Sequence, residues 1–184
     1  TLPDAPTRAG YTFTGWFAAA SGGTALVSGY SPTATAAITL YAQWSAVTNN
    51  TITFDGQGAT TAASGGSTTY TTATAVATIP TTAPLRSGYT FAGWFAAATG
   101  GTQVTNGSYT PSSPYGAITI YAQWSANSNV VTYNSQSGSA VSNGSFTTGS
   151  TLTLPDAPTR AGYTFTGWFA ASSGGTVLVS GYSP

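Results

Sequence analysis

The stretch Arg-x-Gly-Tyr-Thr-Phe-x-Gly-Trp-Phe occurs three times, at residues 8–17, 86–95 and 160–169. In each copy a proline lies two residues before the arginine. Because proline has a fixed φ and no N–H group, it is excluded from a central strand, and the strand is predicted to begin after the first glycine. Successive strand residues point to opposite faces, so Tyr11 and Phe13 share one face. The recurrence of this aromatic stretch indicates an array of repeats.

A glycine interrupts the alternation in every copy. Gly15 stands inside the predicted strand, where a glycine often marks a β-bulge. A bulge here would turn Trp16 to the core side, which strict alternation denies it. The aromatic residues of the three copies, with the tryptophans of a second repeated segment, are therefore predicted to form the module cores. They are Tyr11, Phe13, Trp16, Trp44, Tyr89, Phe91, Trp94, Trp124, Tyr163, Phe165 and Trp168.

The composition favours packed cores and disfavours charged partners. The chain has 184 residues, of which 41% are hydrophobic and 13% aromatic, enough to build a core. It has three basic and three acidic residues and no net charge. Nucleic acids and anionic membrane surfaces require clustered Lys and Arg, which this chain does not have. No apolar run approaches the ~20 residues of a membrane span. We expect neither nucleic-acid binding nor direct membrane insertion of this segment.

The residue types also argue against an enzyme. Acid–base catalysis needs a poised carboxylate, His, Lys or Cys, and of these types the chain contains only aspartates. Asp4 and Asp156 occupy equivalent positions in different units, and Asp55 stands elsewhere, so no carboxylate pair is built within one module. Calcium sites need several carboxylates and zinc sites need His or Cys. We predict no catalytic residue, no metal and no cofactor.

Two repeated segments divide the chain into modules. Residues 1–32 recur as 153–184 with two mismatches, and residues 37–46 recur as 117–126 with one change. Internal similarity of this kind indicates tandem modules. With boundaries in the polar linkers, we predict the C-terminal part of one module, a complete module and the N-terminal part of the next. These are residues 1–46, 47–126 and 127–184.

The last part has no counterpart of residues 118–124. One explanation is that the chain is a piece cut from a longer polypeptide. The other is strand addition, in which a neighbouring chain supplies its residues 38–44. The duplicated residues favour the cut, because a donated strand would bring a redundant copy of the central strand.

The complete module reads as mainly β. Alternating or β-branched residues predict strands at 51–54, 67–78, 89–95 and 118–124. Residues 96–101 are expected to form either a turn or one short helical turn, since Ala favours helix and the following glycines can stop it. No stretch has sustained helical periodicity, so little helix is expected.

The recurrent arginine has two interpretations. Asp4 and Arg8 could form a local ion pair, but Arg86 has Thr82 where Asp4 stands in the first copy, so the pair is not required for the fold. An exposed pair contributes only about 0 to 1 kcal/mol. Alternatively, the arginine stacks on an aromatic ring or bonds to carbonyl groups of the turn.

The order of the motifs resembles the Listeria-Bacteroides repeat, also called the internalin B-type repeat. The motifs are Thr-Phe-Asp-Gly, Gly-Tyr-Thr-Phe-x-Gly-Trp-Phe, Gly-Gly-Thr and Ile-Thr-Leu-Tyr-Ala-Gln-Trp. The resemblance covers essentially the whole chain. It implies a small β-grasp, ubiquitin-like module that occurs in tandem on bacterial surface and secreted proteins, where it serves as a stalk, spacer or adhesion segment.

These observations predict a structural array on a bacterial cell surface or outside the cell, acting as a stalk, fibre or sheath element. Low charge removes the repulsion that keeps proteins apart, so copies of the chain or neighbouring modules are the expected partners. The alternative is an adhesive module that binds polysaccharide or a receptor through exposed aromatic residues. Four tyrosines are the candidates for ligand contact or for packing between modules: Tyr30, Tyr41, Tyr109 and Tyr121.

Overall fold

The computed structural model describes residues 1–33 and 37–184. Eleven strands and no helix occur in this part of the chain, which confirms the prediction of a mainly β protein. The described residues form two compact units. The first comprises Thr1–Pro84 and Ala92–Gln123, and the second comprises Leu85–Phe91 and Trp124–Pro184.

The first repeated stretch forms a two-stranded antiparallel sheet. Strand β1 (Tyr11–Phe17) pairs with β2 (Tyr41–Ala46), and the register shifts between Phe13 and Gly15. This shift confirms the predicted bulge. It places the Phe13 ring 5.7 Å from the Trp16 ring and 5.5 Å from the Trp44 ring, both edge-on. The glycine at φ 139° therefore turns the tryptophan to the same side as the phenylalanine.

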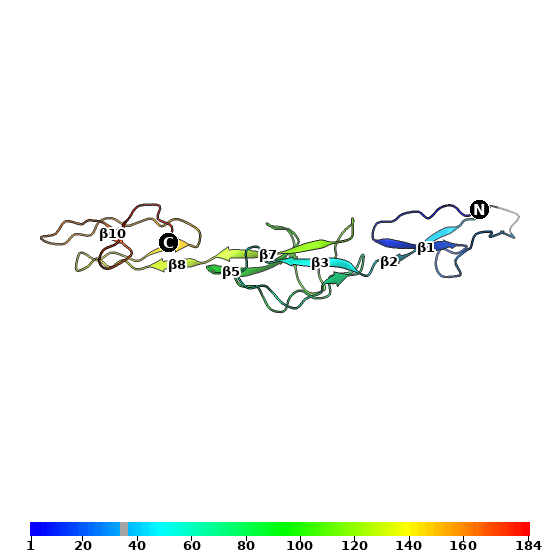
Figure 1. The fold of residues 1–184 in the computed structure, drawn as a ribbon, viewed down its shortest axis with the longest axis horizontal. Helices are drawn as coiled ribbons and strands as arrows, with labels where there is room; N and C mark the ends of the chain where they lie inside the picture. Colours follow the sequence, from blue (N-terminus) through cyan, green and yellow to red (C-terminus); the bar gives the residue numbers. More distant parts are fainter. Residues whose placement is uncertain (34–36) are drawn as a thin grey trace. The chain divides into compact units, whose positions relative to one another are not determined.

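Residues 47–126, which the sequence predicts to be a complete module and which keep that name below, contain a five-stranded mixed sheet. Its strands are β3 (Asn50–Asp55), β4 (Thr69–Tyr70), β5 (Tyr89–Phe95), β6 (Gln103–Val104) and β7 (Ile118–Ala126). They lie in the order β4-β3-β7-β5-β6, so β7 is hydrogen-bonded to both β3 and β5. Figure 1 labels β3, β5 and β7. Strands β3 and β7 are parallel, with Ile52 opposite Ile118.

The best-buried core of the chain lies on this sheet. Trp94 of β5 is 2% exposed, and Val104 of β6 and Ile120 of β7 are fully buried. Along β7, Ile120 and Ala122 are buried while Tyr121 between them is less so, as strand alternation predicts. A central strand with one well-packed face therefore organises the module.

One local prediction was wrong, and a second, which left two alternatives open at residues 96–101, is decided in favour of the turn. The strand expected at 67–78 is reduced to Thr69–Tyr70, because the chain then turns: Thr74 donates its amide to the Thr71 carbonyl, and Ala73 takes a φ of 60°. Residues 96–101 form a loop and no helical turn. There the amide of Ala96 bonds to the Thr102 carbonyl, which closes a hairpin between β5 and β6.

The C-terminal part forms two small antiparallel sheets. Strand β8 (Ser128–Val131) pairs with β9 (Gly144–Thr147), and β10 (Trp168–Phe169) pairs with β11 (Val177–Leu178). Leu152 is buried, and its backbone pairs with that of Tyr182. This part therefore repeats the start and the middle of the complete module.

Candidate interaction surfaces

The recurrent arginine stacks on the recurrent tyrosine. The Cζ atoms of Arg8, Arg86 and Arg160 lie 3.8, 3.9 and 3.9 Å from the ring centroid of the tyrosine three residues later. In all three copies the tyrosine amide also donates to the arginine carbonyl, at 3.0 to 3.1 Å. The stacking interpretation is thereby confirmed. We call the residues 8–11, 86–89 and 160–163 the glycine turns, after the glycine each contains.

Each glycine turn has the same backbone. Gly10, Gly88 and Gly162 all have a φ of 77°, in the left-handed region that glycine enters without steric cost. The turn is thus a rigid local element, held by one hydrogen bond and one cation–π contact, which the sequence builds three times.

Hydrogen bonds connect two of the glycine turns to the residues that begin the following module. The Gly10 carbonyl accepts the amide of Val47 at 3.0 Å, and the Gly88 carbonyl accepts the amide of Asn127 at 2.9 Å. The side chains of Asn50 and Asn129, which were not predicted to have a role, donate to the carbonyl groups of Val47 and Asn127 in these linkers. Their one sequence signal is that an asparagine recurs at the start of both first strands, β3 and β8.

The predicted core aromatics differ in burial. Trp94 is 2% exposed, whereas Tyr163 is 67% and Phe165 is 38% exposed. Phe165 has no counterpart of the Trp44 ring that lies beside Phe13, and Tyr163 has no counterpart of the Tyr115 ring that packs against Tyr11. The other predicted core residues are intermediate in burial: Tyr11, Phe13, Trp16, Trp44, Tyr89, Phe91, Trp124 and Trp168.

The four candidate tyrosines do not behave alike. Tyr30 and Tyr41 are 37% and 39% exposed, but Tyr109 and Tyr121, their counterparts in the complete module, are only partly exposed. The Tyr109 carbonyl accepts the amide of Val76 at 2.8 Å. Residues 1–46 include no counterpart of Val76, so the exposure of Tyr30 reflects a missing neighbour rather than a feature of the complete module.

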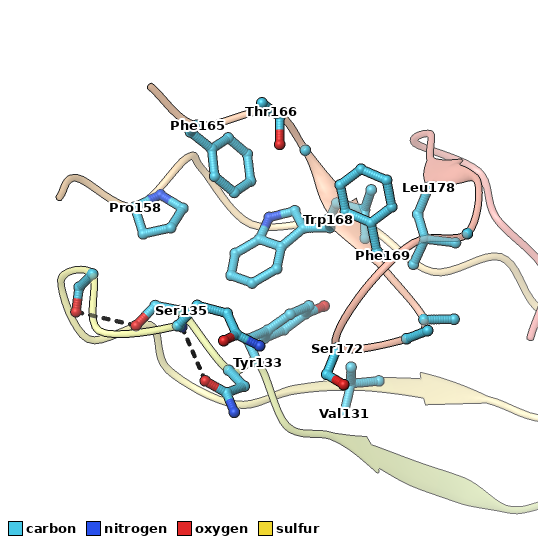
Figure 2. A pocket seen from close by; sticks show the side chains of 18 of the residues that line it. Val131, Tyr133, Ser135, Pro158, Phe165, Thr166, Trp168, Phe169, Ser172 and Leu178 are labelled. Atoms are coloured by element: carbon cyan, nitrogen blue, oxygen red, sulfur yellow. Dashed lines mark hydrogen bonds between the residues drawn. The ribbon is translucent and has the colours of Figure 1, made fainter. Parts of the chain in front are cut away.

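A groove of about 830 Å³ opens beside Trp168 (Figure 2). Its walls carry Tyr133 and Phe165, whose rings lie 5.1 and 5.4 Å from the Trp168 ring. The indole N–H donates to the Pro155 carbonyl at 3.2 Å. Among the described residues that line the groove, Arg160 alone carries a charge, and it stacks on Tyr163. The groove is therefore aromatic and offers no acid–base pair.

The same walls occur in the complete module. The Phe54 and Trp94 rings lie 5.0 Å apart, matching Tyr133 and Trp168 in the groove. Here Trp94 is buried, and strand β7 runs between β3 and β5. A pocket of about 300 Å³ remains beside Phe54 and Trp94 in the complete module, so the space is smaller where β7 is present than in the groove beside Trp168.

The described residues contain neither a metal site nor a membrane-spanning helix. Across residues 1–33 and 37–184, no three His, Cys, Asp or Glu side chains gather where they could hold a metal ion. No helix long and apolar enough to cross a membrane occurs in the part of the chain that the structure describes.

The repeated turns, the repeated strand sequence and the aromatic cores define a tandem-repeat β protein. The Listeria-Bacteroides repeat domain matches residues 1–43, 51–123 and 130–182, and the chain belongs to this family. It is 42% identical over 127 residues to Internalin H of Listeria monocytogenes, which covers 69% of this chain and 21% of that protein.

A second relative is a candidate Gly-rich membrane protein of Evansella cellulosilytica. It is 30% identical over 172 residues, which covers 88% of this chain and 19% of the relative. The chain therefore spans about a fifth of the length of these curated relatives. No solved structure matched the chain.

Proposed function

We propose that the chain is a non-enzymatic structural segment of a bacterial cell-surface or extracellular protein, in which the repeats act as a stalk, fibre or sheath element. The observation that carries the proposal is that the same turn is built three times, each with an arginine over a tyrosine ring. Tandem repetition of one supersecondary unit gives a protein length and a repeated surface. The names of the two relatives, an internalin and a candidate membrane protein, support a location at the cell envelope.

The location can be tested on the bacterium that produces the protein. An antiserum raised against residues 1–184 is expected to label intact cells or the material they shed. The label on intact cells should disappear after the cells are treated with a protease that does not enter them. Labelling that requires permeabilised cells would contradict the proposal.

Partners of the array are proposed to be copies of itself. The chain carries three basic and three acidic residues, so little charge repulsion opposes association. Sedimentation velocity over a range of protein concentrations tests this part. The expected result is an average mass that rises with concentration, and a constant monomer mass would contradict it.

The alternative function, adhesion through exposed aromatic residues, is favoured by the exposure of Tyr41, which is 39% exposed. A glycan array separates the two functions. A structural array predicts no glycan binding above background. Binding that is lost in Tyr41→Ala and retained in Tyr121→Ala, with both variants folded, would favour adhesion.

A further inference from the structure

We propose that the glycine turn is a docking surface through which one repeat holds the next, and that the open copy at residues 160–163 receives the start of a further repeat module. The inference rests on the proposed function only in taking the partner to be another repeat. If the repeats did not contact one another through these turns, the chain could still be a surface array. The two proposals can therefore fail separately.

The first joint lies between the turn at 8–11 and the start of the complete module. Val47 donates its amide to the Gly10 carbonyl at 3.0 Å, and its own carbonyl accepts the Thr72 amide at 2.9 Å. The side-chain amide of Asn50 donates to the Val47 carbonyl at 3.2 Å and to the Thr72 hydroxyl at 3.0 Å. Asn50 is 6% exposed and Thr72 is 2% exposed, so these polar groups are satisfied inside the joint.

The second joint repeats the first with different residues in the linker. Asn127 donates its amide to the Gly88 carbonyl at 2.9 Å and accepts the Thr148 amide at 2.9 Å. The Asn129 side chain donates to the Asn127 carbonyl at 3.3 Å and to the Thr148 hydroxyl at 3.1 Å. The same bonds recur although the linker residue is Val in one joint and Asn in the other, which identifies the backbone of the linker as the docked element.

Close packing gives the glycine a second role. A Cβ atom added to Gly10 would lie 2.8 Å from the Thr72 methyl group and would also clash with the Tyr115 ring. A Cβ added to Gly88 would lie 2.5 Å from the Thr148 methyl group. At Gly162, whose φ is the same, a Cβ would meet nothing within 4 Å. The positive φ of the turn thus explains why all three positions are glycine. At Gly10 and Gly88, close contact with the next module also excludes a side chain.

The third turn is ready to dock without rearrangement. Its arginine stacks at 3.9 Å, as Arg86 does on Tyr89, and its hydrogen bond from Tyr163 to Arg160 is 3.1 Å long. Its tyrosine is 67% exposed, whereas Tyr11 packs edge-on against Tyr115 at a centroid distance of 6.4 Å. A preorganised surface loses less conformational entropy on binding. The occupant that fits is a repeat module beginning with a linker backbone, an asparagine and a threonine placed like Asn50 and Thr72.

The test compares three alanine variants of the full chain by site-resolved amide hydrogen exchange. Gly10→Ala is expected to raise exchange at Val47 and Thr72 at least about tenfold, which corresponds to about 1.4 kcal/mol, and to leave Asn127 and Thr148 unchanged. Gly88→Ala should do the reverse. Gly162→Ala carries the same backbone strain without the clash and should change none of the four amides. Unchanged exchange at all four in Gly10→Ala and Gly88→Ala would overturn the proposal.

The open turn is tested in an extended chain. Because residues 153–184 repeat 1–32, a copy of residues 33–126 placed after Pro184 continues the array by sequence. In this chain, Gly162→Ala is expected to raise exchange at the appended copies of Val47 and Thr72, as Gly10→Ala does in the first joint. If Gly162→Ala has no effect there while Gly10→Ala retains its own, the proposed role of the third turn is wrong.

Discussion

One sequence has two structures in this chain. Residues 11–17 form the seven-residue strand β1, whereas the identical residues 163–169 are strand only at Trp168–Phe169. Strand β1 is paired with β2 from Tyr11 to Phe17, and residues 127–184 contain no copy of the β2 sequence. Strand propensity depends strongly on such neighbours. The partner strand, and not the motif alone, decides how much of the motif is extended and covered.

Burial follows the same difference. Trp94 has β7 beside its strand and is 2% exposed, while Trp168 borders an open groove. The aromatic pairs beside the two tryptophans are nevertheless alike. The Phe54 and Trp94 rings lie 5.0 Å apart in the complete module, and the Tyr133 and Trp168 rings lie 5.1 Å apart in the groove. Strand β7 therefore covers a core in which the paired aromatic rings take the same arrangement without it.

Removal of the central tryptophan is expected to have the largest effect. Trp94→Ala should lower the free energy of unfolding by about 3 to 5 kcal/mol, because a fully buried aromatic side chain leaves a cavity. Trp168→Ala should cost clearly less, since one side of this ring faces the groove. Urea unfolding measures the loss of stability in both variants, and hydrogen exchange shows which residues have lost protection. Equal costs would show that the groove is closed in solution.

The last strand provides the second comparison. Ile120→Ala should destabilise the complete module by about 2 to 5 kcal/mol, because Ile120 is fully buried. Its counterpart Leu40 keeps part of its surface exposed, so Leu40→Ala should cost less than half as much. The same urea titrations test this prediction. If Leu40→Ala costs more than half as much as Ile120→Ala, Leu40 must be buried by residues outside β1 and β2.

The arginine stack should have the smallest effect. Arg8→Ala is expected to lower stability by about 0.5 to 1 kcal/mol, the usual contribution of an exposed cation–π contact. Asp4→Ala is the matched control and should change stability by less than about 0.5 kcal/mol. Arg160→Ala removes the same stack where the tyrosine is exposed, so it measures the cation–π contact without strand packing. A cost for Asp4→Ala equal to that of Arg8→Ala would restore the ion-pair interpretation.

Local chemistry made part of this structure predictable. Alternation placed β3, β5 and β7, and Gly15 marked the bulge because no other feature of the strand explains a glycine there. The strand that contains β4 was predicted too long because the positive φ at Ala73, where the chain turns, is not evident from an alanine. The exposure of Tyr163 was not predictable from the residues next to it in the sequence, because the same residues surround Tyr11. The joints were missed because their bonds link residues far apart in sequence, such as Gly10 and Val47.

Addition of only the missing strand tests whether a partner strand completes the last repeat. A copy of residues 33–46 placed after Pro184 supplies the counterpart of β2 to residues 163–169 and no following module. The amides of Thr164 to Thr166 should then become protected from hydrogen exchange to the level of Thr12 to Thr14, while the Tyr163 amide is already bonded to the Arg160 carbonyl. An appended copy with Ile38→Ser and Leu40→Ser serves as the control and should protect these amides less. If the unaltered copy leaves the exchange of Thr164 to Thr166 unchanged, the partner strand does not complete the repeat.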